Sequence, residues 1–380
     1  MRILVCPLDW GLGHAARCIP LIRAFLAAGH EVRVAAAGGA LRLLRSEFPD
    51  LPWNGFPGYR VRYTRSAALL APALLAQAPA IALGLWAEKR ALRRLLARHP
   101  CDIIVSDGRY GAIAPGIPSV LITHQIAFRV PCGAPGAKLA EAFLLRLNLA
   151  ALARFRRVWI PDWPGDRSLA GELAGPSDPS GRREWLGPLG RFAPGGTELR
   201  TGGPRIALAA VVSGPEPQRT LFESALRKAL AGLSGTRVLV RGLPGNPGPG
   251  LETLRDGELN VFDHLPGAQL ARVFTLADAV VARSGYTTVM ELAVMGAPAP
   301  VLVPTPGQTE QEYLAHHLAG LGAAVRREQH ALDLGNALTE ARGLPGFKAW
   351  REDDPAARLS AFVAAHPLLD SPVVGKARQQ

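Results

Sequence analysis

The stretch that decides the fold covers residues 3–36 and reads ILVCPLDWGLGHAARCIPLIRAFLAAGHEVRVAA. Residues 3–6 form a short apolar run, which predicts a strand that is buried on both faces. A glycine-rich turn follows, and residues 15–28 then predict a helix that ends at Gly29. Residues 31–36 predict the next strand. A strand, a helix and a second strand joined by short loops are typical of a parallel sheet with helices on both faces.

This alternation continues through the first half of the chain and restarts in the second. Short apolar runs at residues 103–105, 119–123 and 158–160 predict further strands, each followed by polar residues. Residues 190–204 are rich in glycine and proline, which is the composition of a linker. Strands and helices then alternate again over residues 205–318. The fold class that we predict is therefore α/β, with two Rossmann-like, doubly wound parallel-sheet domains.

The expected domain boundaries follow from these patterns. Residues 1–190 form the N-terminal domain, 191–204 the linker and 205–345 the C-terminal domain. In residues 346–380 we expect a last helix near 353–366 that crosses back to the first half, followed by a loose basic tail.

Composition excludes several classes of protein. The 380 residues are 48% hydrophobic and 19% charged, so the chain can bury sizeable cores and is not disordered over most of its length. Lys and Arg number 43 against 31 Asp and Glu, which gives a net charge of +12. This surplus suits phosphates or an anionic membrane face, although a codon bias towards Arg is an equal alternative. No module of basic and aromatic residues accompanies it, so nucleic acid is not an expected partner.

The cysteines and the start of the chain indicate the compartment. Cys6, Cys18, Cys101 and Cys132 form no CxxC pair and no spacing typical of a metal site. A chain of this length with so few cysteines suits a reducing cytosol. The charged lead and cleavage site of a secretory signal are missing. We therefore expect a cytoplasmic protein.

One uncharged run, residues 66–87, approaches the length of a membrane span. Pro72 and Pro79 interrupt the run, and alanine, which inserts weakly, is frequent in it. We expect a buried pair of helices, with an interfacial helix as the second interpretation and a true span as the least favoured. The basic stretch from Lys89 to Arg98 follows directly and suits an anionic surface.

Ligands of such sheets bind beyond the carboxyl ends of the strands, so the loops after the strands carry the chemistry. In the loop after the first strand, Gly11 and Gly13 let a ligand approach the backbone N–H groups at a helix start. His14 at the tip can take a proton from an attacking hydroxyl; a helix-capping histidine is the alternative. No Gly-Lys-Ser/Thr follows and no acidic residue ends the second strand, so the loop is neither a Walker A loop nor a dinucleotide fingerprint.

Two clusters in the second half have a similar placement. Residues 281–291 end a strand and start a helix, which makes a second cradle for an anion. Glu291 lies about one turn into that helix, where its carboxylate can accept two ribose hydroxyls or cap the helix start. Residues 304–312 follow another strand and combine amides with carboxylates, which suits sugar hydroxyls. The candidate binding residues of the two clusters are Arg283, Ser284, Gly285, Thr287, Glu291, Gln308, Glu310 and Gln311.

These motifs resemble those of the GT-B glycosyltransferases, in particular the family of the peptidoglycan lipid II-forming N-acetylglucosaminyltransferase, within glycosyltransferase family 28. The Gly-Leu-Gly-His sequence at 11–14 is similar to that family's GGxGGH loop, with fewer glycines. Arg283-Ser284-Gly285, followed by Thr287-x-x-x-Glu291, is similar to its RSGAxTxxE segment.

Two further loops carry weaker parts of the resemblance. Residues 304–313 are similar to the family's loop ending in Gln-Gln-Tyr, with Glu312 in place of the second Gln. Residues 212–218 stand where the family has a second glycine-rich loop, of which Ser213 and Gly214 are kept. The layout matches over most of the chain, and the match is specific around residues 280–313.

The resemblance implies a GT-B fold in which two domains face a cleft, with the acceptor on the N-terminal side and a UDP-sugar held mainly by the C-terminal domain. Glu291 would hold the ribose, and the backbone near Phe262 would meet the uracil. Phosphate or nucleotide would face Ser284, Gly285 and the loop at Ser213 and Gly214. Glu310 and Gln311 would hold the transferred sugar.

The resemblance also implies that no metal is tightly held and no cofactor is needed. The sequence contains no DxD pair, so helix dipoles and arginines must neutralise the departing UDP. Inversion at the anomeric carbon requires a base on the face away from UDP. His14 is the first candidate, Asp107 the second and His124 the third, and Asp9 is a further polar group in the first loop.

The acceptor is a hydroxyl compound, and a lipid-linked one would suit the apolar run and the basic stretch of residues 89–98. Arg154, Arg156 and Arg157 would add to such a surface, which would place the protein peripherally on the inner face of the plasma membrane. A core helix with a solvated basic face is the alternative. Two other functions stay open at this point: a non-hydrolysing UDP-sugar 2-epimerase and a sugar-nucleotide-binding protein without catalysis.

Overall fold

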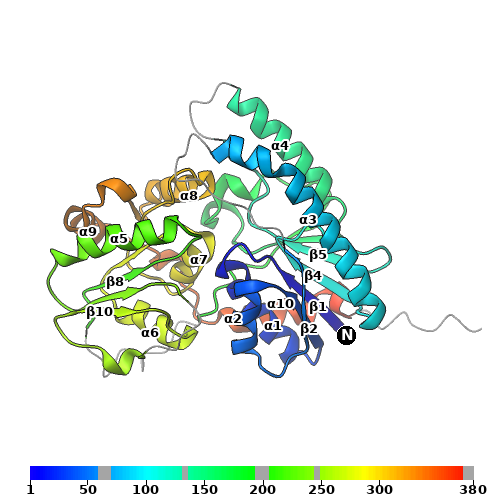
Figure 1. Cartoon of the computed structure of the whole chain (residues 1–380), viewed down its shortest axis with the longest axis horizontal. Helices are drawn as coiled ribbons and strands as arrows, with labels where there is room; N and C mark the ends of the chain where they lie inside the picture. Colours follow the sequence, from blue (N-terminus) through cyan, green and yellow to red (C-terminus); the bar gives the residue numbers. More distant parts are fainter. Residues whose placement is uncertain (59–69, 131–135, 193–204, 244–248, 371–380) are drawn as a thin grey trace, which may run out of the picture.

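The computed structural model describes residues 1–58, 70–130, 136–192, 205–243 and 249–370. Two parallel sheets, each covered by helices, lie next to each other (Figure 1). This arrangement confirms the predicted α/β class with two doubly wound domains. The expected linker lies mostly outside the described residues, as does the tail beyond residue 370.

The described part of the N-terminal sheet has seven parallel strands in the order β3-β2-β1-β4-β5-β6-β7. Because β1 lies between β2 and β4, the chain reverses direction across the sheet at β1, and ligand sites form at such a switch point. The bounds of the strands are β1 Arg2–Pro7, β2 Glu31–Ala36, β3 Trp53–Gly55, β4 Ile103–Asp107, β5 Ser119–Ile122, β6 Arg157–Ile160 and β7 Arg183–Trp185.

The described part of the C-terminal sheet has six parallel strands in the order β10-β9-β8-β11-β12-β13. Its switch point lies between β8 and β11, which are hydrogen-bonded neighbours. The bounds of the strands are β8 Leu208–Val211, β9 Arg237–Val240, β10 Leu259–Phe262, β11 Val280–Ala282, β12 Val301–Leu302 and β13 Val325–Arg326.

Helices cover both faces of each sheet, as the crossovers of a parallel sheet require. In the N-terminal half these are α1 Leu12–Ala27, α2 Gly38–Glu47, α3 Leu70–Arg98 and α4 Ala137–Leu152. In the C-terminal half they are α5 Gln218–Ala231, α6 Gly267–Leu276, α7 Tyr286–Val294, α8 Thr309–Gly320, α9 Leu334–Arg342, α10 Pro355–Ala365 and α11 Pro367–Asp370.

Strand β1 shows how an apolar run produces this layering. Successive side chains of a strand point to opposite faces, so a strand covered on both faces is apolar throughout. Ile3 and Val5 pack with the buried side of α1, whereas Leu4 and Cys6 pack with Leu92 of α3 on the other face. These four side chains are each at most 1% exposed.

Two segments cross from one domain to the other. Helix α10 packs against α1, where Leu359 and Val363 belong to the N-terminal core (Figure 1). In the opposite direction, Leu169 and Leu173, which follow β6, are buried in the core of the C-terminal domain. Apolar side chains from before and after the linker are therefore buried in the core of the opposite domain, and this holds the two domains together.

The expectation of a buried helix pair in the apolar run was wrong. Residues 70–98 form the single helix α3, in which Pro79 is accommodated, and residues 66–69 lie outside the described part. Leu83 is 69% exposed and Trp86 is 60% exposed. The stretch is too uniformly apolar for its buried face to be read from the sequence, because alanine and leucine stand on every side. Among the described helices, none combines the length and apolar character that a membrane span needs.

Candidate active site

Two helix N-termini from different domains meet at the candidate site. Helix α1 starts after β1 with Gly11 as its N-cap, whose φ of 126° is accessible to glycine at little cost. Helix α7 starts after β11 with Gly285 as its N-cap. A Cβ atom added to Gly13 would lie 2.8 Å from Oγ1 of Thr287, so only glycine fits there. Backbone N–H groups of both helices therefore point towards one region, where they favour an anion.

His14, Asp107 and Arg17 form a buried charged cluster next to this point. Asp107 ends β4, and Oδ1 of its carboxylate lies 2.8 Å from Nδ1 of His14. Arg17, one turn along α1, donates from Nε to Oδ2 of Asp107 at 2.6 Å and from Nη2 to Oδ1. Asp107 has no exposed surface and Arg17 is 3% exposed, whereas the His14 side chain is 23% exposed. Of the three groups, the imidazole is the one that solvent or a substrate reaches.

The charges of this cluster set its protonation. Burial alone would raise the pKa of Asp107, but the charges of Arg17 and His14 and their hydrogen bonds outweigh it and hold that pKa at about 2. Burial and the adjacent Arg17 charge lower the pKa of His14 below its usual value, although Asp107 opposes them. At neutral pH the cluster therefore holds an ionised carboxylate, a guanidinium and a neutral imidazole.

His124 links this cluster to the C-terminal domain. It follows β5, and its Nδ1 lies 3.4 Å from Nη1 of Arg17. Its Nε2 lies 2.9 Å from Oε1 of Glu310, at the start of α8, and its ring stacks on Tyr286 with centroids 3.8 Å apart. Burial would raise the pKa of Glu310, but His124 and Arg17 outweigh it, so the carboxylate is ionised. An interdomain bridge thus runs from Asp107 through Arg17 and His124 to Glu310.

The loop after β12 is tied to the turn after β11. Ser284 donates from Oγ to the carbonyl of Gln311 at 2.8 Å. The amide of Gln311 accepts from the backbone N–H of Thr305 at 2.9 Å and donates to Oε1 of Gln308 at 2.5 Å. Gln308, Glu310 and Gln311 are partly exposed, so this loop presents polar groups from a fixed backbone.

Arg283, a candidate binding residue, lies in the protein interior. The side chain has no exposed surface, and its guanidinium stacks on Phe222 at 4.0 Å. It donates to the carbonyls of Val303 and Pro304 at 3.2 and 2.9 Å and to that of Gln218 at 3.2 Å. Burial lowers its pKa to about 9. Arg283 therefore connects the ends of two strands to the start of α5 and positions the loops around the site.

Glu291 has a partner that its sequence position did not predict. The carboxylate is 3% exposed, and its Oε1 accepts from Nε of Arg191 at 2.6 Å. Burial raises the pKa of Glu291, while the Arg191 charge opposes that shift. A ribose at this carboxylate would have to share it with Arg191.

The remaining candidate residues lie at or just after the carboxyl ends of strands β8, β10 and β11. Ser213 is partly exposed and Gly214 is exposed, with a φ of 105° and no atom within 4 Å of an added Cβ. Gly285 has similar open space. Phe262 ends β10 and is 3% exposed, and its carbonyl accepts from the N–H of Arg241 at 2.8 Å. Ser213, Gly214 and Gly285 are thus accessible, whereas the ring of Phe262 belongs to the core.

Sequence reasoning missed Arg17, Tyr286 and Arg191. Arg17 lies three residues after His14, a spacing that places both on one face of a helix. That spacing was the available signal. Tyr286 and Arg191 had no such signal, because their partners come from distant parts of the chain.

The comparisons with known proteins find a family match and several relatives. Residues 262–343 match the glycosyltransferase family 28 C-terminal domain. An uncharacterised glycosyltransferase of Methanopyrus kandleri is 26% identical over 79% of this chain and 85% of its own length. A second relative, from a Methylobacterium species, is 29% identical over 78% of this chain and 76% of its own length. Its name is UDP-N-acetylglucosamine--N-acetylmuramyl-(pentapeptide) pyrophosphoryl-undecaprenol N-acetylglucosamine transferase.

Solved structures show the same fold. The crystal structure of the glycosyltransferase of kitacinnamycin superposes with a TM-score of 0.61 at 21% identity and covers 95% of each chain. Two facing sheets of this order together with a family 28 domain define the class: the chain is a glycosyltransferase of the GT-B fold.

Within that class the resemblance is specific. The C-terminal half carries the glycosyltransferase family 28 domain, and the chain as a whole resembles the family of the lipid II-forming N-acetylglucosaminyltransferase. The relatives are named glycosyltransferases, which favours the transferase over the epimerase and the non-catalytic alternative.

Proposed function

We propose that the protein is an inverting, metal-independent transferase that moves a hexose or N-acetylhexosamine from a UDP-sugar to an acceptor hydroxyl. The observation that carries the proposal is the 2.8 Å contact between Nδ1 of His14 and Oδ1 of Asp107, beside the two helix N-termini. It supplies an oriented base at the place where backbone N–H groups favour a diphosphate.

His14 is the base in this mechanism, and Asp107 positions it. A carboxylate with a pKa of about 2 is too weak a base to take a proton at neutral pH, which argues against Asp107 itself. Asp107 accepts a hydrogen bond from the protonated Nδ1, so the lone pair of His14 stands on Nε2. That nitrogen removes the hydroxyl proton as the acceptor oxygen bonds to the anomeric carbon, and the bond to UDP breaks in the same step. UDP leaves with the electron pair, and solvent later takes the proton.

Arg17 is a positioning residue. It keeps Asp107 ionised and bonds to both carboxylate oxygens, including Oδ1, which is also the partner of His14. Its Nη2 lies 2.8 Å from Nδ1 of His14, and two N–H groups cannot bond to each other. This contact is therefore electrostatic and keeps the imidazole neutral, which is the form that a base needs.

The third candidate base, His124, is better suited to joining the domains. Both of its ring nitrogens have partners, Arg17 and Glu310, and the residue is 7% exposed. We assign Glu310 and Gln311 to the transferred sugar and Glu291, together with Arg191, to the ribose. Phosphate oxygens would meet the N–H groups of Gly13, Ser284 and Gly285 and the hydroxyl of Thr287.

The donor is assigned to the UDP-sugars on two grounds. The relative from Methylobacterium has UDP-N-acetylglucosamine in its name, and the family 28 match at residues 262–343 lies within the domain to which the donor is assigned. A thermal-shift panel of UDP, GDP and TDP tests this assignment. UDP at 100-fold its dissociation constant should stabilise the protein by about 2.7 kcal/mol, and equal shifts with all three nucleotides would contradict it.

A lipid-linked acceptor at an anionic membrane surface is the acceptor that we favour. Leu83 and Trp86 of α3 and Leu139 and Phe143 of α4 are each at least 60% exposed, and both helices belong to the N-terminal half (Figure 1). The basic residues 89–98 continue α3. Exposed apolar groups next to cationic ones suit a peripheral position on the inner face of the plasma membrane.

Flotation with anionic liposomes tests the membrane position. The protein should float with the liposomes at low salt, and Leu83→Ser combined with Trp86→Ser should reduce the bound fraction severalfold. Leu321→Ser on the C-terminal domain, where Leu321 is 39% exposed, is the control. Absence of co-flotation for the wild-type protein at low salt would overturn the membrane assignment and leave the transferase assignment intact.

A further inference from the structure

A second concave site lies on the N-terminal domain, at the edge of the sheet opposite the candidate active site. The hollow has a volume of about 760 Å³ and is bounded by the loop of residues 113–118, the end of α4 and the amino ends of β5 and β6. His14, Asp107 and His124 all lie at carboxyl ends of strands. Since the two ends of a parallel sheet face opposite directions, this hollow is separate from the catalytic groups.

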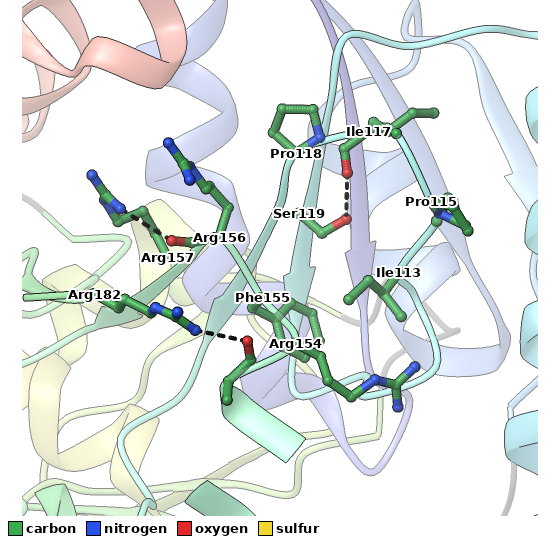
Figure 2. A pocket seen from close by; sticks show the side chains of 13 residues that line it. Ile113, Pro115, Ile117, Pro118, Ser119, Arg154, Phe155, Arg156, Arg157 and Arg182 are labelled. Carbon is green, nitrogen blue, oxygen red and sulfur yellow. Dashed lines mark hydrogen bonds between the residues drawn. The ribbon is translucent and has the colours of Figure 1, made fainter. Parts of the chain in front are cut away.

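Its walls divide into an apolar side and a basic side. Ile113, Pro115 and Ile117 of the loop lie on one side in Figure 2, and Arg156, Arg157 and Arg182 lie on the other. Arg154, which also lines the hollow, lies below Ile113 in the same view. The lining contains these four arginines and no acidic residue.

Two of the four arginines are held by the protein. Arg182 donates from Nη1 to the carbonyl of Ala153 at 2.8 Å, at the end of α4. Arg157 donates from Nε to Oε1 of Glu184 at 2.8 Å and from Nη1 to the carbonyl of Arg156 at 3.2 Å. These bonds fix the direction of both side chains along the wall, which preorganises the basic side at no cost to a ligand.

The other two arginines, Arg154 and Arg156, differ from Arg157 in their charged neighbours. Within the part of the chain that the structure describes, Arg154 and Arg156 make no side-chain ion pair, and Glu184 is the one carboxylate paired with any of the four guanidinium groups. Four positive charges around one hollow repel each other, and an anion between them would relieve that repulsion. Arginine forks match the oxygens of a phosphate group, whereas the isoleucine and proline wall suits an apolar substituent.

We propose that this hollow binds a phosphate ester, with the phosphate between the arginines and the organic part against residues 113–118. The volume falls in the range of about 300–1,000 Å³ that is usual for small-molecule sites. The phosphate can belong to a soluble compound or to the headgroup of a phospholipid. The proposal is independent of the proposed transferase function, because the hollow shares no residue with that site.

The test compares the wild type with Arg154→Gln/Arg156→Gln. Arg272→Gln/Arg342→Gln, on the C-terminal domain, is a control with the same change of net charge. Calorimetry with glycerol 3-phosphate tests the soluble source, with excess UDP present to occupy the nucleotide site. Sedimentation with phosphatidylcholine vesicles that contain phosphatidylglycerol tests the headgroup.

We expect the first double variant to weaken at least one of the two interactions by about tenfold or more, and the control to change it less than twofold. Loss with glycerol 3-phosphate assigns a soluble ester, and loss with the vesicles alone assigns a headgroup. If neither probe distinguishes the two double variants, the proposal is wrong. Sugar transfer to a soluble acceptor should be unchanged in both variants, so a failure of the transferase assignment would be seen separately.

Discussion

Gly13 of the N-terminal domain lies so close to Thr287 of the C-terminal domain that a Cβ on Gly13 would stand 2.8 Å from the threonine hydroxyl oxygen. A carbon and an oxygen cannot approach that closely without displacement. The two helix N-termini that frame the candidate site are thus held at a separation that a single methyl group would alter. Catalysis that uses both domains depends on this separation.

Gly13→Ala should push the two helices apart. Overpacking costs about 1–3 kcal/mol, so we expect a lower unfolding temperature and a weaker UDP affinity. Thr287→Ala in the same protein removes the hydroxyl that collides and should restore part of the stability. Thermal unfolding of the two single variants and of the double variant measures the coupling; purely additive losses would show that the contact does not limit the domain approach.

His14→Ala tests the base. General-base catalysis contributes about 10²–10⁴-fold, so the turnover number should fall by that factor. UDP affinity should stay within about twofold, because the nucleotide is assigned to the other domain. His330→Ala, an exposed histidine far along the chain, is the control and should keep full activity. A His14→Ala enzyme with wild-type turnover would move the base elsewhere.

Arg17 should control the pH dependence of turnover. Its charge lowers the pKa of His14, and activity requires the neutral imidazole, so turnover falls as pH drops through that pKa. Arg17→Met removes a cause of the lowering, and the pKa of His14 rises beside the remaining Asp107 carboxylate. The acid limb of the kcat/KM profile should therefore shift to higher pH.

Arg17→Lys keeps a positive charge and should leave that limb closer to its wild-type position. It cannot form the two-nitrogen grip on Asp107, so its turnover should still be below that of the wild type. Equal pH profiles for the wild type and Arg17→Met, with turnover reduced, would indicate that Arg17 has a merely structural role.

Arg283→Met should destabilise the protein rather than weaken substrate binding. The guanidinium donates hydrogen bonds to the carbonyls of Val303, Pro304 and Gln218. In the variant these buried carbonyls would be left without that donor. A buried carbonyl left without its donor costs about 1–3 kcal/mol, which should lower the denaturant midpoint of unfolding clearly. UDP affinity, measured on the folded fraction, should change much less than it does in Ser284→Ala. A large loss of UDP affinity at unchanged stability would restore the substrate contact that the sequence suggested.

The helices and strands that were predicted well are those in which the apolar residues follow a clear pattern. Residues 15–28 were predicted as a helix and all but the last of them lie in α1, and the run at residues 3–6 lies within β1. Strands β3 and β7 have three residues each, too few for a pattern to appear. Helix α4 was not predicted, because leucines and alanines occur on all of its sides and no apolar face stands out. Four of its large apolar side chains are exposed.

The sequence alone predicted at which ends of the strands the candidate residues lie. Parallel strands expose their carboxyl ends on one edge, so His14, Asp107, His124 and the loop before Gln311 could be assigned to one region from their position after strands. Which groups pair there was decided by the tertiary structure. Arg17 bonds to Asp107 across 90 residues and His124 to Glu310 across 186, and Arg283 is enclosed while Ser213 and Gly214 stay open. The reason is physical: a strand end gives a residue its location, but the pKa and the hydrogen bonds of a side chain depend on neighbours that only folding brings within reach.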